Sequence, residues 1–155
     1  MTFNPEQAIS TDRIVDLKST RKSDVLDELI GLLATSDKVN DPVELKRKIY
    51  EREKTVSTGV GAGMAIPHVK IPSITDFVAA IGRSREGLQF DSLDGQSTHI
   101  VVMIGCNNTQ SADFLKVLAR LVTRLKDETI KRRIMDAETP EDIRSVFIGQ
   151  NGILA

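Results

Sequence analysis

The feature that most limits the fold of this chain is an unbroken apolar run, HIVVMIG, from His99 to Gly105. A run of this length that is rich in β-branched residues predicts a buried strand. A second short apolar run lies at Phe77 to Gly82, and Asp94-Gly95 between the two runs is a turn signal. The middle of the chain is therefore expected to form a sheet.

Helices are predicted on both sides of this strand-rich middle. Residues 20–34 place leucine, isoleucine and valine at helical spacing, and residues 113–126 carry a second apolar face. Asp41-Pro42-Val43-Glu44 combines a capping acid, a proline in the first turn and a later glutamate, so it predicts a helix that runs to about Glu53. A last helix is expected to begin at Thr139. Helices before and after a sheet predict an α/β domain with helix–sheet–helix layers and a mixed sheet.

The composition limits the possible functions. The chain has 155 residues, which fits one domain over 1–155, and its net charge of −1 gives no electrostatic case for binding nucleic acid or an anionic membrane surface. No apolar run is long enough to cross a bilayer, and the first residues lack a secretion signal. One cysteine cannot form an internal disulfide, so a cytoplasmic location is expected. Two histidines without metal-ligand spacing predict no metal site, and no cofactor is expected.

The segment STGVGAGMAIPHVK, residues 57–70, holds the best candidates for chemistry. Its glycines Gly59, Gly61 and Gly63 permit backbone conformations with positive φ, and such loops often bind phosphate through their N–H groups. The dinucleotide pattern G-x-G-x-x-G fails because its sixth position is Met64, and the chain has no Gly-Lys-Ser/Thr triplet. Nucleotide binding is therefore disfavoured.

His68 follows this loop. A neutral imidazole is nucleophilic near neutral pH, and it can attack phosphorus and later leave, which suits a reversible phosphoryl carrier. The N–H groups of Gly61 and Gly63 and a nearby arginine could offset the phosphoryl charge. A histidine that only satisfies a hydrogen bond at a strand end fits the pattern equally well, and residue chemistry does not separate these roles. His99, in its packed apolar setting, is expected to be structural.

Several segments together resemble a known family. Arg52-Glu53 followed by STGVGAGMAIPH at 57–68 is similar to the signature of the fructose/mannitol/nitrogen-type enzyme IIA proteins of the phosphoenolpyruvate-dependent phosphotransferase system. The resemblance extends over residues 82–105, 114–134 and 138–147. It implies a three-layer α/β/α sandwich with a small mixed sheet. It also implies that His68 accepts a phosphoryl group from the phosphocarrier protein HPr or its nitrogen-branch counterpart, as a component of a phosphotransferase rather than a stand-alone enzyme.

The resemblance also implies roles for neighbouring residues. Arg52 falls at the arginine that lies beside the active histidine of the family, although a solvated charge at a helix end is the alternative. The hydroxyls of Ser57 and Thr58 are expected to donate hydrogen bonds to the same phosphate. Many family members carry a second histidine that faces the active one, and Phe114 occupies that position here, so part of the usual stabilisation of the phosphoryl group is missing.

Two classes of function remain open at this point. In the first, His68 carries a phosphoryl group towards a sugar permease component or signals through its phosphorylation state. In the second, the chain is a regulatory module that binds a target protein, with vestigial or absent phosphorylation. The short chain carries no permease segment, which favours the nitrogen-regulatory branch. The apolar residues expected to form the contact surface of such a module are Met64, Ile66, Val69 and Ile71.

Overall fold

The centre of the molecule is a six-stranded mixed sheet. The computed structural model describes residues 3–55 and 57–155. In the sheet the strands follow the order β1-β5-β6-β3-β2, and β4 also pairs with β6. Strand β5 is parallel to β1 and antiparallel to β6, while β3 and β4 are both parallel to β6. The strands are β1 (Ile9–Asp16), β2 (Gly59–Gly61), β3 (Met64–Ala65), β4 (His68–Lys70), β5 (Val78–Leu88) and β6 (Thr98–Cys106).

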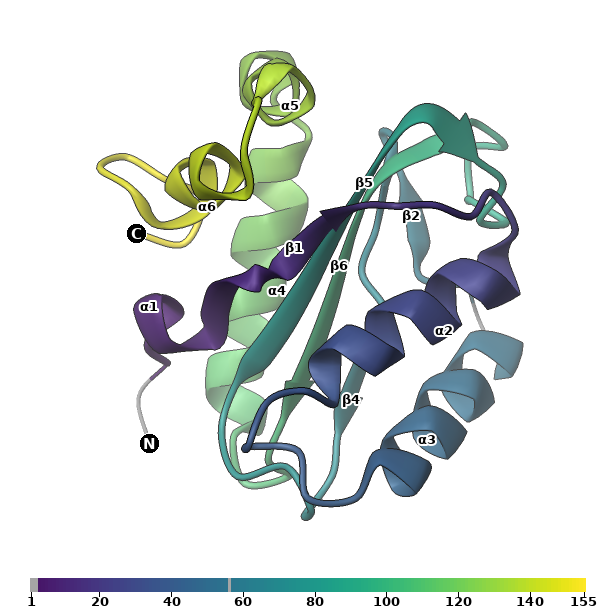
Figure 1. Ribbon diagram of the computed structural model, residues 1–155, viewed down its shortest axis with the longest axis vertical. Coiled ribbons are helices and arrows are strands. Elements are labelled where there is room, and N and C mark those ends of the chain that lie inside the picture. Colours follow the sequence, from purple (N-terminus) through teal and green to yellow (C-terminus); the bar gives the residue numbers. More distant parts are fainter. Residues whose placement is uncertain (1–2, 56) are drawn as a thin grey trace.

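Helices cover both faces of this sheet (Figure 1). Helices α2 and α3 lie against one face, and α4, α5 and α6 lie against the other, which confirms the layered α/β prediction. The helices within the described residues are α1 (Pro5–Ala8), α2 (Lys22–Leu33), α3 (Pro42–Thr55), α4 (Ser111–Leu125), α5 (Glu128–Asp136) and α6 (Pro140–Ile148).

Each face of the sheet has its own hydrophobic core, and β6 contributes to both. Val101 and Met103 pack towards α2 and α3, whereas Ile100, Val102 and Ile104 pack towards α4. All five side chains are at most 3% exposed. Burying one such side chain stabilises a fold by about 1.5–3 kcal/mol. β6 therefore helps to join the two layers, as does β5, which also contributes to both cores. This explains why the sequence of β6 shows no alternation.

All four predicted helices and both predicted strands occur close to their expected places. Asp41 caps α3 as expected, because its carboxylate accepts a hydrogen bond from the backbone N–H of Glu44 at 3.0 Å. Thr139 caps α6 in the same way, through the N–H of Asp142 at 3.1 Å. Strand β5 continues beyond the expected end at Gly82, as far as Leu88.

A buried arginine holds the part of β5 that directly follows Gly82. Arg83 is 2% exposed, and its guanidinium donates to Asp16 of β1 at 2.7 Å. It also donates to the carbonyl oxygens of Ile134 and Ala137 at 2.8 and 2.6 Å. A charged side chain can remain buried in a strand when all its donors are satisfied in this way. Arg83 thereby connects the sheet to the end of α5.

The register of β3 and β4 decides which way His68 points. Met64 pairs with Ile100 and His68 pairs with Ile104, so both short strands keep the same offset against β6. Side chains two residues apart in an extended chain share a face. His68 therefore lies on the face of Met64 and Ile66, which pack in the core beneath α4.

Candidate functional site

The glycine-rich segment forms a tight hairpin between β2 and β3. Gly61 pairs with Met64, and the two residues between them, Ala62 and Gly63, have φ values of 57° and 78°. Positive φ at both central positions is typical of the two-residue hairpin turn that matches the twist of a sheet. The glycines therefore shape a turn that returns the chain to β6, ahead of His68.

His68 begins β4 and is 9% exposed. Its Nδ1 lies 2.8 Å from the carbonyl oxygen of Ile66. A carbonyl can only accept a hydrogen bond, so Nδ1 carries the proton and the lone pair of the neutral ring is at Nε2. The main chain thus assigns the tautomer and leaves Nε2 as the nucleophilic nitrogen.

The surroundings of His68 favour the neutral form of the ring. Burial of the ring lowers its pKa below the ordinary value, and the positive charges of Arg52 and Lys70 act in the same direction. The hydrogen bond to Ile66 and the charge of Glu53 oppose this shift. Because a nucleophile needs an unprotonated nitrogen, the lowered pKa favours the reactive form at neutral pH.

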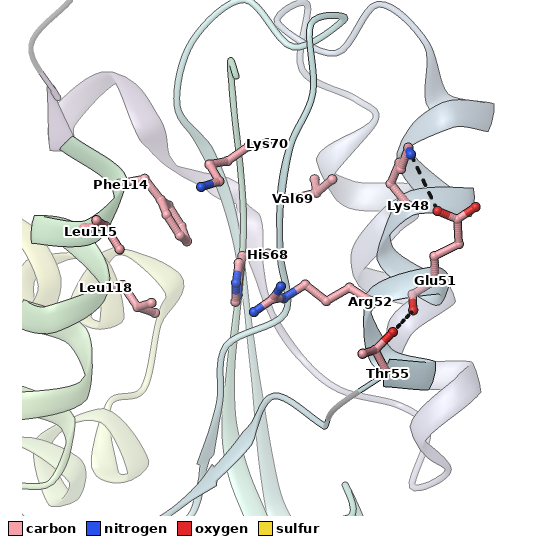
Figure 2. Close-up of a pocket in the computed structure, with 10 residues that line it drawn as sticks. All are labelled: Lys48, Glu51, Arg52, Thr55, His68, Val69, Lys70, Phe114, Leu115 and Leu118. Carbon is pink, nitrogen blue, oxygen red and sulfur yellow. Dashed lines mark hydrogen bonds and ion pairs between the residues drawn. The ribbon is translucent and has the colours of Figure 1, made fainter. Parts of the chain in front are cut away.

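His68 lies on a cleft of about 510 Å³ at the edge of the sheet (Figure 2). Helix α3 forms one wall, α4 forms the other, and β4 runs between them. The cleft is lined by Lys48, Glu51, Arg52, Thr55, His68, Val69, Lys70, Phe114, Leu115 and Leu118.

Two cations in this cleft have no carboxylate partner within the described residues. Figure 2 shows the guanidinium of Arg52 reaching from α3 towards the ring of His68, while the ammonium of Lys70 enters from β4. The carboxylate of Glu51 is already paired, with Lys48 at 3.6 Å and with Arg47 at 3.3 Å. The cleft therefore holds uncompensated positive charge beside His68, which favours an anion.

Phe114 lies directly beside His68. The two ring centroids are 5.0 Å apart with an interplanar angle of 36°, and Phe114 is 2% exposed. The ammonium of Lys70 lies 5.4 Å from the centroid of the same phenyl ring. Phe114 thus belongs both to the core under α4 and to the wall of the cleft.

The other residues predicted to bind phosphate lie outside the cleft lining. The Ser57 hydroxyl donates to the carbonyl oxygen of Phe90 at 2.7 Å, and the Thr58 hydroxyl donates to the carboxylate of Glu53. Gly61 and Gly63 lie in the hairpin turn, where the nearest side chains are those of Asp94 and His99. The structure brings Arg52 to His68, and it does not bring these four residues into the same cleft.

The expected apolar contact surface is wrong. All four residues are at most 7% exposed, because Met64 and Ile66 pack in one core of the sheet and Val69 and Ile71 pack in the other. The exposed apolar residues beside His68 come from α4 instead. Leu115 is 63% exposed and Leu118 is half-buried.

Sequence reasoning missed Lys70 as a site residue. The signal was available, since Lys70 lies two residues after His68 and an extended segment places such residues on one face. His99, by contrast, was expected to be structural. Its Nδ1 lies 2.8 Å from the carbonyl oxygen of Ser84, so it joins β5 to β6 away from the cleft.

The fold and the site define a class of protein: a layered α/β domain that presents one histidine, with its Nε2 unprotonated, beside two cations. The family model described as "Phosphoenolpyruvate-dependent sugar phosphotransferase system, EIIA 2" matches residues 9–149. The chain belongs to this family.

Individual relatives and a solved structure agree with this assignment. The chain is 38% identical over 133 residues to the fructose-specific EIIABC component of Bacillus subtilis, which covers 86% of the chain and 21% of that protein. It is 32% identical to a nitrogen regulatory protein of Bradyrhizobium diazoefficiens, with 84% and 85% of the two chains covered. The structure of the nitrogen regulatory protein IIA-Ntr from Neisseria meningitidis superposes with a TM-score of 0.83 at 25% identity, covering 90% and 95%.

The coverage of these relatives decides how much of their function can be assigned to this chain. The chain spans about one fifth of the length of the Bacillus subtilis relative, but most of the length of the Bradyrhizobium protein. Family and relatives support a role as a phosphoryl carrier or regulator within the phosphotransferase system. None of the helices in the described ranges is long and apolar enough to span a membrane.

Proposed function

We propose that Nε2 of His68 accepts a phosphoryl group from an HPr-type phosphocarrier protein in the cytoplasm. The observation that carries this proposal is the hydrogen bond of 2.8 Å between Nδ1 and the carbonyl oxygen of Ile66. It leaves the lone pair of Nε2 as the nucleophile in a cleft that also contains Arg52 and Lys70.

The transfer step exchanges one bond for another at phosphorus. The lone pair of Nε2 attacks the phosphorus atom while the bond between phosphorus and the donor breaks, and that electron pair stays on the donor. The Nδ1 proton remains in place, so the phosphorylated ring carries a positive charge that the Ile66 carbonyl stabilises. Transfer to a further acceptor is the same step in reverse, which makes His68 a carrier.

Arg52 and Lys70 offset the charge of the phosphoryl group. The group carries close to two negative charges at neutral pH, and hydrogen bonds between ionised partners are about twice as strong as neutral ones. The planar guanidinium of Arg52 can bind two phosphoryl oxygens at once. Lys70 approaches from β4, and its ammonium lies near the ring of Phe114. Many members of the family have a second histidine at this position.

The downstream partner is either a sugar permease component or a regulatory target protein. The fructose-specific relative supports the first role, and the nitrogen regulatory relatives support the second. The exposed side chain of Leu115 and the partly exposed Leu118 lie on the rim of the cleft, where an approaching protein would contact them. The replacement of an imidazole by Phe114 favours the regulatory role, because it removes one donor to the phosphoryl group.

Phosphorylation with phosphoenolpyruvate, enzyme I and an HPr-type carrier tests the proposal. Intact mass should rise by about 80 Da, one phosphoryl group, and mild acid should remove the label because it cleaves phosphohistidine. The His68→Ala variant should remain unlabelled, while His99→Ala, which alters the other histidine away from the cleft, should be labelled normally. A label that persists in His68→Ala would refute the assignment. A folded wild-type protein that takes no label from either the sugar-branch or the nitrogen-branch carrier would favour the module without phosphorylation.

A further inference from the structure

A buried ion pair lies behind the cleft, between the start of α2 and the end of α3. The Lys22 ammonium is 2.7 Å from the Glu53 carboxylate, whose side chain is only 5% exposed. The same ammonium lies 4.7 Å from the centroid of the Phe90 ring. Burying a carboxylate costs desolvation free energy, which is offset only when the group is paired and hydrogen-bonded. The structure therefore satisfies Glu53 with several partners.

The partners of Glu53 lead towards His68. One oxygen of its carboxylate accepts from the backbone N–H of Thr58 at 3.3 Å, and the other accepts from the Thr58 hydroxyl. The carbonyl oxygen of Thr58 accepts from the N–H of Ile66 at 3.0 Å. The carbonyl oxygen of Ile66 then accepts from Nδ1 of His68 at 2.8 Å. The backbones of Thr58 and Ile66 and their hydrogen bonds thus connect the Glu53 carboxylate to the imidazole.

Glu53 also anchors the last turn of α3, the helix that carries Arg52. It directly follows Arg52 in the last turn of α3, where helices tend to fray. Pairing with Lys22 of α2 and with Thr58 anchors this turn to two other parts of the molecule. The anchored turn sets the position from which the long side chain of Arg52 reaches the cleft.

We propose that Glu53 is a positioning residue that fixes both His68 and Arg52 for phosphoryl transfer. The inference rests on the proposed function of His68, and it assigns Thr58 to the support of the imidazole rather than to the phosphate. It also explains why a carboxylate stands next to an arginine that binds an anion. Glu53 is not among the residues that line the cleft; it lies with Lys22 in a separate hollow between α2 and α3, where the ammonium balances its charge.

The Glu53→Gln variant tests this proposal, with Glu44→Gln as the matched control. Glu44 lies on the same helix and also accepts a hydrogen bond from a loop hydroxyl, that of Ser73 at 2.6 Å, but it lies at the far end of α3. In Glu53→Gln we expect phosphorylation to slow by about ten- to hundredfold, since small displacements of reacting groups have effects of this size. The control should keep the wild-type rate.

Measurements on the unphosphorylated protein separate positioning from general stability. NMR titration of the His68 ring should show a lower pKa in Glu53→Gln, because a negative charge near the imidazolium is removed. Hydrogen exchange should become faster at Nδ1 of His68 and at the amides of Thr58 and Ile66. These readouts need no phosphoryl donor, so a wild-type protein that fails to accept phosphate would refute the proposed function and leave the positioning test intact.

An unchanged phosphorylation rate in a folded Glu53→Gln variant would overturn the proposal. So would a slower rate with wild-type titration and exchange at His68. If Glu53→Gln does not fold, Thr58→Val decides by rate and exchange, because it removes the hydroxyl that donates to Glu53 and leaves no charge unpaired. Faster exchange at Ile66 and His68 with slower transfer supports the inference, and wild-type behaviour in both contradicts it.

Discussion

Replacing Phe114 by histidine tests whether the wall of the cleft contributes to the lifetime of a phosphorylated state. The centroid of the Phe114 ring lies 5.0 Å from that of the His68 ring, so we expect a ring nitrogen at position 114 to come within hydrogen-bond distance of a phosphoryl oxygen on Nε2. Such a charge-assisted hydrogen bond is worth about 1.5–3 kcal/mol. This corresponds to a roughly ten- to hundredfold longer lifetime of the phosphoprotein.

The same substitution should destabilise the unphosphorylated protein. Phe114 is 2% exposed and packs in the core under α4, so an imidazole there leaves a polar nitrogen unpaired. An unsatisfied buried donor or acceptor costs about 1–3 kcal/mol. In a domain of this size 1 kcal/mol lowers Tm by roughly 2–4 °C, so the expected decrease is about 2–12 °C.

The assay follows the decay of the phosphorylated mass after the donor is removed, alongside calorimetric Tm. Phe114→Leu is the control, because it disturbs the same packing without adding a hydrogen-bond donor. We expect a lower Tm in both variants and a longer lifetime only in Phe114→His. A lifetime equal to that of wild type, with a lowered Tm, would show that residue 114 does not reach the phosphoryl group.

Three further predictions concern single groups. Arg52→Ala should slow phosphorylation without changing Tm, and Arg52→Lys should recover only part of the rate because it loses the planar fork; equal rates in all three proteins would reduce Arg52 to a helix-end charge. Burial lowers the pKa of His68 in the folded protein, so the unfolded chain binds a proton at this residue at higher pH than the folded one. The stabilisation that neutral His68 gives the fold is therefore complete above the unfolded pKa of about 6.5 and is lost as the pH falls through the folded pKa. Calorimetry should show a smaller acid-induced decrease of Tm in His68→Gln over this range, and parallel curves would contradict it. Burial raises the pKa of Cys106 to about 11, so a thiol reagent at pH 8 should leave the native protein unmodified and label it after unfolding; rapid labelling of native protein would count against this burial.

The parts of the fold that could be predicted are those with local signals. The apolar face of residues 113–126 and the cap at Asp41 each depend on residues that are close together in sequence, and both occur in the structure. Strand β1 was missed because ISTDRIVD is half polar and is ordered by pairing with β5. Helix α5 was missed because it buries fully only Ile134 among nine residues. Strands β2 to β4 are two or three residues long, so only pairing with distant partners defines them.

The candidate site was predictable only in part for a similar reason. His68 and Arg52 were found from their chemistry and from the family resemblance, and the structure places both on one cleft. Ser57 and Thr58 are close to His68 in sequence, but their hydroxyls bind Phe90 and Glu53, which long-range packing brings near. Proximity along the chain was a poor guide here because the hairpin at Gly61 and Gly63 separates the two segments.

The position of His68 on β4 has a consequence for partial unfolding. Among the described residues β4 pairs only with β6, and the cleft takes Arg52 from one helical layer and Phe114 from the opposite layer. The sheet otherwise keeps these layers apart. Local opening of either layer at sub-denaturing urea would therefore dismantle the cleft while β5 and β6 remain paired. The proposed phosphoryl transfer would therefore report on both cores, and we expect it to be lost when either core loosens.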